Sequence, residues 1–110
     1  MSGTGPVEQE TIKREVNEAI ERGLWPGEQH EMVRMRCECG HVGCADFLEI
    51  SAAEYERVRA DGRRFLITPG HEKPEIEHVV ARRPSYSVVE KDGVAGRVAE
   101  AADPRDPGSS

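Results

Sequence analysis

The sequence predicts an α+β fold in which two helices pack on a small, mainly antiparallel sheet that is cross-linked by a structural zinc site. Three observations predict it. Segments with helical spacing of apolar residues alternate with short segments in which apolar and polar residues alternate. Only 36% of the 110 residues are hydrophobic and 5% are aromatic, so the core must be thin. All three cysteines lie in one short stretch, where a metal ion would add the stability that a thin core lacks.

The domain is expected to cover residues 9–102, because the chain has the length of one domain and contains no internal repeat. Residues 1–8 are predicted to form a flexible lead. Residues 103–110, which include two prolines, one glycine and two serines, have the composition of a disordered tail.

The first predicted helix covers residues 10–22, where apolar residues recur at the spacing of one helical face: Ile12, Val16, Ala19 and Ile20. Gly23 ends this helix, and Trp25 is expected to fold back over it. Residues 32–37 alternate apolar and charged side chains, which predicts a strand, and residues 47–50 form the next one.

A capping box of Ser51 and Glu54 begins the second predicted helix, which ends at Gly62. The apolar run 65–67 is a buried strand that stops at the Pro69-Gly70 turn. Residues 76–80 and 86–90 are predicted to form a hairpin. Residues 94–102 fit either a last strand or a short helix.

The chemically distinctive feature is the sequence Cys37-x-Cys39-x4-Cys44. Thiolates are favoured zinc ligands, and a structural zinc site closes with four cysteines or with three cysteines and a histidine. An odd number of cysteines also fits a metal site better than a disulfide framework. The sequence therefore predicts a structural Zn²⁺ held by these three thiolates and one imidazole.

His71 is the favoured fourth ligand, because a metal stabilises most when it joins segments that are distant in sequence. His41 is its main competitor, but a fourth ligand from the same tight loop would strain the tetrahedron. Of the other two histidines, His30 precedes the first predicted strand and His78 lies on a predicted strand. We also expect the backbone to bend near Cys39, so that both thiolates of the C-x-C pair reach one ion.

Other interpretations of the cysteines remain open. They could be buried small side chains or free thiols, or Cys39 and Cys44 could form a redox pair, although that pair lacks the C-x-x-C spacing. Glu72, next to His71, could serve as the base of a zinc enzyme. A solvated loop acid is the simpler interpretation of Glu72, and no catalytic constellation is present in the sequence.

The net charge of −6 disfavours nucleic acid and anionic membrane as partners, because both are polyanions. The sequence contains no apolar run long enough for a membrane span and no signal peptide at its start, so we expect a cytoplasmic protein. Six arginines on or beside predicted strands could form a basic face for an acidic protein or a phosphate group: Arg34, Arg36, Arg63, Arg64, Arg82 and Arg83. The alternative is a solvated face that is paired with nearby glutamates.

The combination of Cys37-Glu38-Cys39-Gly40, Cys44 and Pro69-Gly70-His71-Glu72 resembles a group of small, uncharacterised proteins from high-GC actinobacteria. The resemblance extends from about Asn17 to Arg105. It implies a bacterial source and strengthens the choice of His71, but it implies no activity.

From the sequence we therefore expect a non-enzymatic, zinc-stabilised module that acts through a protein partner in a regulatory or adaptor role. The alternative hypothesis is a thiol-based redox or metal sensor that uses the same cysteines.

Overall fold

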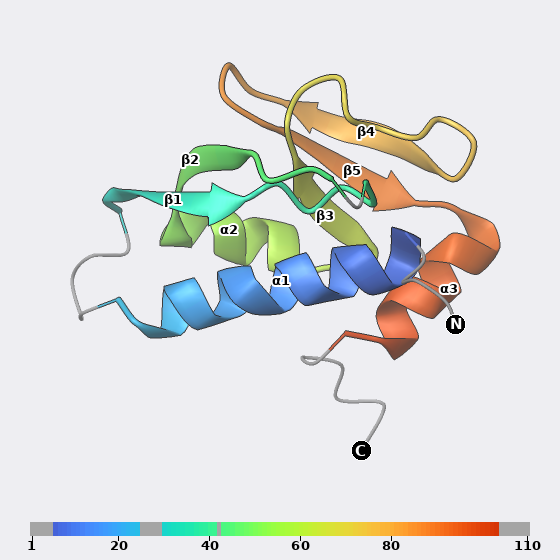
Figure 1. Cartoon of the computed structure of the whole chain (residues 1–110), viewed down its shortest axis with the longest axis horizontal. Coiled ribbons are helices and arrows are strands. Elements are labelled where there is room, and N and C mark those ends of the chain that lie inside the picture. Colours follow the sequence, from blue (N-terminus) through green and yellow to red (C-terminus); the bar gives the residue numbers. More distant parts are fainter. Residues whose placement is uncertain (1–5, 25–29, 42, 104–110) are drawn as a thin grey trace.

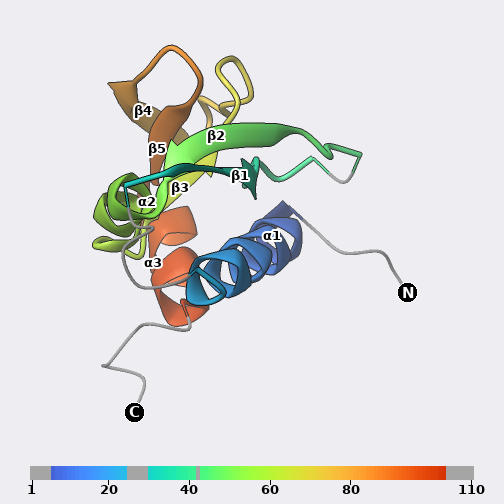
Figure 2. The same cartoon turned by 90° about the vertical axis from the view of Figure 1, so that its left-hand side faces the viewer.

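The computed structural model describes residues 6–24, 30–41 and 43–103. Within these residues the chain is an α+β protein with three helices and two small antiparallel sheets. The elements in chain order are α1 (Pro6–Arg22), β1 (Met32–Arg36), β2 (Phe47–Ser51), α2 (Ala52–Arg59), β3 (Arg64–Ile67), β4 (Glu77–Arg82), β5 (Ser87–Lys91) and α3 (Gly93–Ala101). Helices α1 and α3 lie side by side on one side of the strands (Figures 1 and 2). The predicted fold class is confirmed.

The strands form two sheets rather than the single sheet that we expected. Strands β1 and β2 pair as a hairpin in which Met35 faces Leu48, and the other three strands have the order β3-β5-β4. The two sheets meet at β3, where the amide of Glu38 donates to the carbonyl of Leu66 over 2.6 Å. This contact joins the end of the first hairpin to the centre of the domain without a continuous ladder.

The predicted hairpin at 76–90 is present, and it contains an irregularity that the sequence did not reveal. Val79 pairs with Val89 and Ala81 pairs with Val88, so Val80 is an extra residue in β4. Such a bulge changes the alternation of side chains along a strand. Strand β4 is also an edge strand of its sheet.

The capping box of α2 is confirmed: the Glu54 amide donates to the Ser51 hydroxyl over 3.2 Å, and the Ser51 amide donates back to the Glu54 carboxylate over 3.5 Å. Residues 94–102 were ambiguous, and the structure resolves them in favour of a helix, α3. That helix is the third, where two were expected. Gly93 begins it with a φ of 50°, which glycine adopts without strain.

The orientation of α1 is opposite to the prediction. Ile12 and Val16, expected to face the core, are 48% and 38% exposed, and Ala19 is exposed as well. Of the predicted face, Ile20 alone packs against the core. The face that α1 buries is polar instead: Glu10, Lys13, Arg14, Asn17 and Glu18. Because apolar spacing was the only orientation cue in the sequence, the prediction followed the wrong face.

Charge pairs and hydrogen bonds hold this polar face against the domain. Glu18 accepts from Arg59 over 2.5 Å, and Lys91 is paired with both Glu10 and Glu77. The guanidinium of Arg14 lies over the ring of Phe65, 4.4 Å from its centroid. Groups buried in this way must be paired to offset the loss of hydration.

The ends of the chain differ in part from the predicted boundaries. Helix α1 begins at Pro6, inside the predicted lead, and Asp103, assigned to the tail, is buried and paired with Arg59. The rest of the predicted lead and tail, residues 1–5 and 104–110, and Trp25 lie outside the described residues. Within the described chain, no helix has both the length and the apolarity that a bilayer crossing requires.

Candidate metal centre

Three segments bring Cys37, Cys39, Cys44 and His71 together. The first two cysteines follow β1, Cys44 comes from the loop before β2, and His71 lies in the turn after β3. One ligand atom from each of the four side chains lies within 4.8 Å of the others, so the group could hold a metal ion. Cys37 and Cys39 are buried, whereas Cys44 and His71 are partly exposed. The structure therefore assembles the four residues that the sequence predicted.

The side chain between the two buried cysteines points the other way. Glu38 is fully buried, and its carboxylate accepts from the Leu66 amide at 2.9 Å, the Tyr55 hydroxyl at 2.5 Å and the Asn17 amide group at 2.9 Å. Residues two apart share one side of an extended chain. The alternation of Cys37, Glu38 and Cys39 accounts for the shared direction of the two thiols, and the bend that we expected is not required.

Helix α1 fixes the position of this segment through Asn17. The Asn17 side chain donates to the carbonyl of Arg36 over 2.9 Å and accepts from the amide of Arg36 over 2.7 Å. It thereby satisfies both backbone groups of the last residue of β1, as a neighbouring strand would. Burial raises the pKa of the Glu38 carboxyl, and its three donors act in the opposite direction by favouring the ionised form.

The turn after β3 orients the imidazole of His71. Gly70 has a φ of 94°, a conformation that side chains rarely adopt, and the His71 amide donates to the carbonyl of Thr68 over 3.0 Å. Nδ1 of His71 lies 3.6 Å from Sγ of Cys37 and 3.7 Å from Sγ of Cys44. His71 thus directs Nδ1, and not Nε2, toward the thiols.

These distances match a zinc tetrahedron closely. Zn–S bonds of about 2.3 Å and Zn–N bonds of about 2.0–2.1 Å at tetrahedral angles give S···N edges of roughly 3.5–3.6 Å. The observed edges of 3.6 and 3.7 Å are only slightly longer. The two known sulfur–nitrogen distances are therefore compatible with a tetrahedral zinc ion.

Two donors to the sulfur atoms complete the surroundings. The Thr68 amide donates to Sγ of Cys37 over 3.1 Å, and Nζ of Lys13 lies 3.9 Å from Sγ of Cys39 while it donates to the carbonyls of Cys39 and His41. Burial raises the pKa of the Cys37 thiol to about 12. That thiol keeps its proton at neutral pH unless a cation enters the group.

The other histidines lie elsewhere. His41 is exposed and is not part of the group, although its ring stands edge-on to that of His71 with centroids 6.0 Å apart. His78 contacts Asp92, and His30 is exposed just before β1. The carboxylate of Glu72 accepts from the Gly70 amide and lies outside the donor group.

Sequence reasoning missed Lys13, Asn17 and Asp46 as parts of the site. Lys13 and Asn17 lie on the polar face of α1, which we expected to face solvent. Asp46 approaches Nε2 of His71 to within 3.7 Å. One sequence feature could have indicated a polar partner for this segment. Glu38 lies between two cysteines, so the alternation of side chains directs its carboxylate away from the metal and toward the core, where it needs donors such as Asn17.

The arginines that we grouped from the sequence lie in different surroundings in the structure. Arg34 and Arg36 lie over the ring of Phe47, with 5.0 and 5.7 Å to its centroid, and Arg63 is paired with Glu100. Arg64 and Arg83 line a pocket on another part of the surface.

No protein-family model matches the chain, and the comparisons with curated proteins and with solved structures find no match either. These comparisons do not bear on the resemblance to the actinobacterial proteins, which stays a prediction.

Proposed function

We propose that the chain is a small non-enzymatic module that is stabilised by a structural zinc ion and acts through a protein partner. The observation that carries the metal part of the proposal is the grouping of Cys37, Cys39, Cys44 and His71, whose ligand atoms lie within 4.8 Å of one another. Three thiolates and an imidazole favour zinc over magnesium or calcium, which prefer oxygen ligands.

The ligand set supports a structural role rather than a catalytic one. Four protein donors complete the coordination of zinc, whereas catalytic sites keep one position open for water or substrate. Three thiolates, a neutral imidazole and Zn²⁺ carry a net charge of −1, which the nearby ammonium of Lys13 would balance. The cross-link would join the β1–β2 loop to the turn after β3, so the ion would hold the two sheets together.

The three cysteines are free of disulfides, as a zinc site requires. A cytoplasmic location is part of the proposal, because thiols stay reduced there and remain able to bind zinc. The partner is proposed to be another protein, because the net charge of −6 opposes binding to polyanions such as nucleic acid and anionic membranes.

The alternative is a thiol-based redox or metal sensor, and the partial exposure of Cys44 and His71 favours it, since an oxidant or chelator could approach from that side. Elemental analysis of tag-free protein tests both proposals. A structural site gives about one zinc per chain, and the fold melts when a chelator removes it. A folded sample with less than about a tenth of an equivalent of metal would overturn the zinc proposal. Release of zinc by mild peroxide with retention of the fold would favour the sensor.

A further inference from the structure

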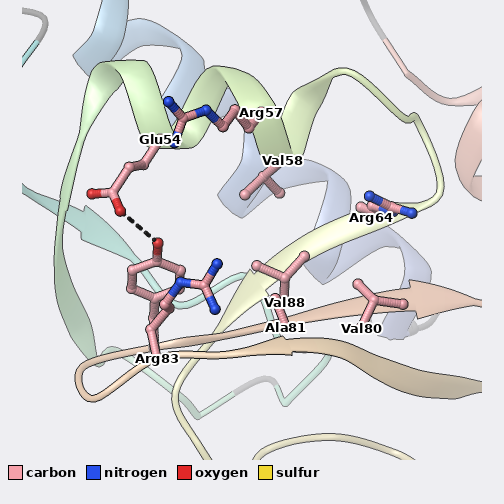
Figure 3. Close-up of a pocket in the computed structure, with 9 residues that line it drawn as sticks. Glu54, Arg57, Val58, Arg64, Val80, Ala81, Arg83 and Val88 are labelled. Atoms are coloured by element: carbon pink, nitrogen blue, oxygen red, sulfur yellow. Dashed lines mark hydrogen bonds between the residues drawn. The ribbon is translucent and has the colours of Figure 1, made fainter.

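The described surface contains a pocket between α2 and the β3-β5-β4 sheet, and none of its lining residues is a candidate metal ligand (Figure 3). Its floor is aliphatic and consists of Val58, Val80, Ala81 and Val88. The bulge in β4 explains the floor: without the extra residue, Val80 and Ala81 would point to opposite faces of the sheet. Both side chains line the pocket instead.

Three guanidinium groups surround this floor: those of Arg57, Arg64 and Arg83. Arg64 is paired with Glu90 at 3.0 Å and with Asp61 at 3.8 Å. Arg57 and Arg83 are exposed, and neither has a carboxylate partner in the part of the chain that the structure describes. Two unmatched cations beside an apolar floor stand out in a chain with a net charge of −6.

The acidic residue that lines the pocket, Glu54, forms no ion pair with Arg57 or Arg83 in the described part of the chain. Glu54 accepts from the Tyr86 hydroxyl over 3.1 Å, the contact dashed in Figure 3, and it also serves in the capping box of α2. Its carboxylate is therefore committed to hydrogen bonds inside the protein. One nitrogen of Arg83 donates to the carbonyl of Arg82 over 3.1 Å, so both arginines keep further N–H donors for a carboxylate that comes from outside.

The volume of the pocket indicates whether it can hold a small molecule or only a single side chain. It holds about 130 Å³. Small-molecule and cofactor sites usually measure about 300–1,000 Å³, whereas a cavity of roughly 150 Å³ accepts a group the size of benzene. The space suits one aliphatic side chain. The edge position of β4 beside it leaves room for an extended partner segment.

We propose that this pocket docks an extended acidic segment of a partner protein, which seats one aliphatic side chain on the valine-lined floor and pairs flanking carboxylates with Arg57 and Arg83. The inference rests on the proposed role as a protein-binding module and names the surface and the chemistry of the partner. Carboxylates that meet guanidinium groups without a carboxylate partner form charge-assisted hydrogen bonds, which give both affinity and orientation.

Selection of random peptides on the zinc-loaded protein tests the proposal, with the Arg57→Glu/Arg83→Glu double variant as the counter-selection surface. We expect enrichment of peptides that combine a leucine, isoleucine or valine with neighbouring aspartate or glutamate. No enrichment over the double variant, or enrichment of basic peptides, would overturn the proposal.

The most enriched peptide is then labelled with a fluorophore, and its affinity is measured by fluorescence anisotropy. The double variant should bind it at least about tenfold more weakly, and the loss should shrink at high salt. Val80→Asp should weaken peptide binding to a similar extent, because it places a charged group on the apolar floor. Arg97→Glu, which reverses the charge of one exposed arginine on α3 and so makes half the charge change of the double variant, should bind like the wild type. Equal losses in Arg97→Glu and in the pocket variants would overturn the proposal.

Two further measurements assign the partner class and separate this proposal from the zinc proposal. Replacing the peptide carboxylates by phosphoserine should not strengthen binding; a gain of more than about tenfold would overturn the carboxylate assignment in favour of a phosphorylated partner. Zinc content and melting temperature are recorded for every variant. Peptide binding by a folded, zinc-free wild type would refute the metal site alone, and zinc-loaded protein that selects no peptide would refute the pocket alone.

Discussion

Nε2 of His71 lies 3.7 Å from the carboxylate of Asp46, on the side of the ring opposite the nitrogen that faces the thiols. The Thr68 hydroxyl donates to the same carboxylate oxygen over 3.3 Å. A histidine that binds a metal through one nitrogen commonly donates its other N–H to a carboxylate, which fixes the tautomer and the ring orientation. Asp46 is therefore placed to support His71 as a ligand.

Asp46→Asn should weaken zinc binding by roughly tenfold, the low end of the about 10–100-fold usual for such supporting residues, because the contact is long and half exposed. Competition with a chromophoric chelator measures the affinity. Glu49→Gln, an exposed acid on β2, is the matched control and should leave the affinity unchanged. Equal affinities for Asp46→Asn and wild type would remove Asp46 from the site.

His71→Ala should strip the zinc and melt much of the fold, because the ion then loses its link between distant segments. Structural zinc supplies about 10–16 kcal/mol in small peptides, so even a partial loss exceeds the stability of a thin core. The melting temperature should fall by at least roughly 10 °C, since each kcal/mol corresponds to about 4–8 °C in a domain of this size. Bound zinc and melting temperature are the measurements.

His41→Ala is the matched control for that experiment, because His41 is an exposed histidine in the β1–β2 loop that carries the cysteines and is not part of the donor group. It should keep its zinc and lose little stability. If His41→Ala loses the metal and His71→Ala retains it, the site is local to the loop and the cross-link between the sheets does not exist.

Glu38→Gln should destabilise the fold by about 1–3 kcal/mol, because an amide has one acceptor oxygen and cannot satisfy all three donors that the carboxylate satisfies. Urea denaturation of the zinc-loaded protein measures the change. The exposed Glu49→Gln again serves as the control for the loss of one charge. A neutral result for Glu38→Gln would mean that the buried hydrogen bonds contribute no net stability.

Asn17→Ala should cost at least about 2 kcal/mol, because it leaves the backbone N–H and C=O of Arg36 without their side-chain partner and removes one of the two donors to Oε2 of Glu38. Ile12→Ser and Val16→Ser, on the exposed face of the same helix, should each change stability by no more than about 0.5 kcal/mol. Thermal denaturation of the three variants checks this order. The reverse order would restore the helix orientation that the apolar spacing predicted.

The wild-type protein should lose stability as the pH rises because of the buried Glu10 carboxyl, and Glu10→Gln should remove this pH dependence. Burial raises the pKa of the Glu10 carboxyl above its usual 4.5, with Lys91 opposing the shift and Glu77 adding to it. The folded state thus binds this proton more tightly than the unfolded state, so stability falls as the pH rises above 4.5 and through the folded-state pKa. The difference in unfolding free energy between variant and wild type, followed upward from mildly acid pH, should move in favour of the variant. A difference that is independent of pH would contradict the raised pKa.

Local chemistry made much of this fold predictable from the sequence. Ser51 and Glu54 predicted the start of α2, and Gly70 predicted the turn that carries His71, because capping and turn conformations depend on neighbouring residues alone. The clustering of the three cysteines likewise predicted three members of the donor group, and His71 was added because a metal stabilises most when it joins distant segments. The orientation of α1 was not predictable, since its partners Arg59 and Lys91 lie more than forty residues further along the chain. The pocket floor was missed because the bulge at Val80 depends on pairing with β5.

Because the buried face of α1 is polar, separation of this helix from the rest of the domain would expose mainly polar groups of the helix to water. Release of a helix that docks through Lys13, Asn17 and Glu18 would hydrate charged and amide groups, while its apolar residues Ile12 and Val16 already face water. Hydration of polar surface lowers the heat capacity and hydration of apolar surface raises it, so this opening would have a small heat-capacity change. It would also remove the ammonium of Lys13 from Cys39 and leave the negative charge of a zinc–thiolate centre without its counter-ion.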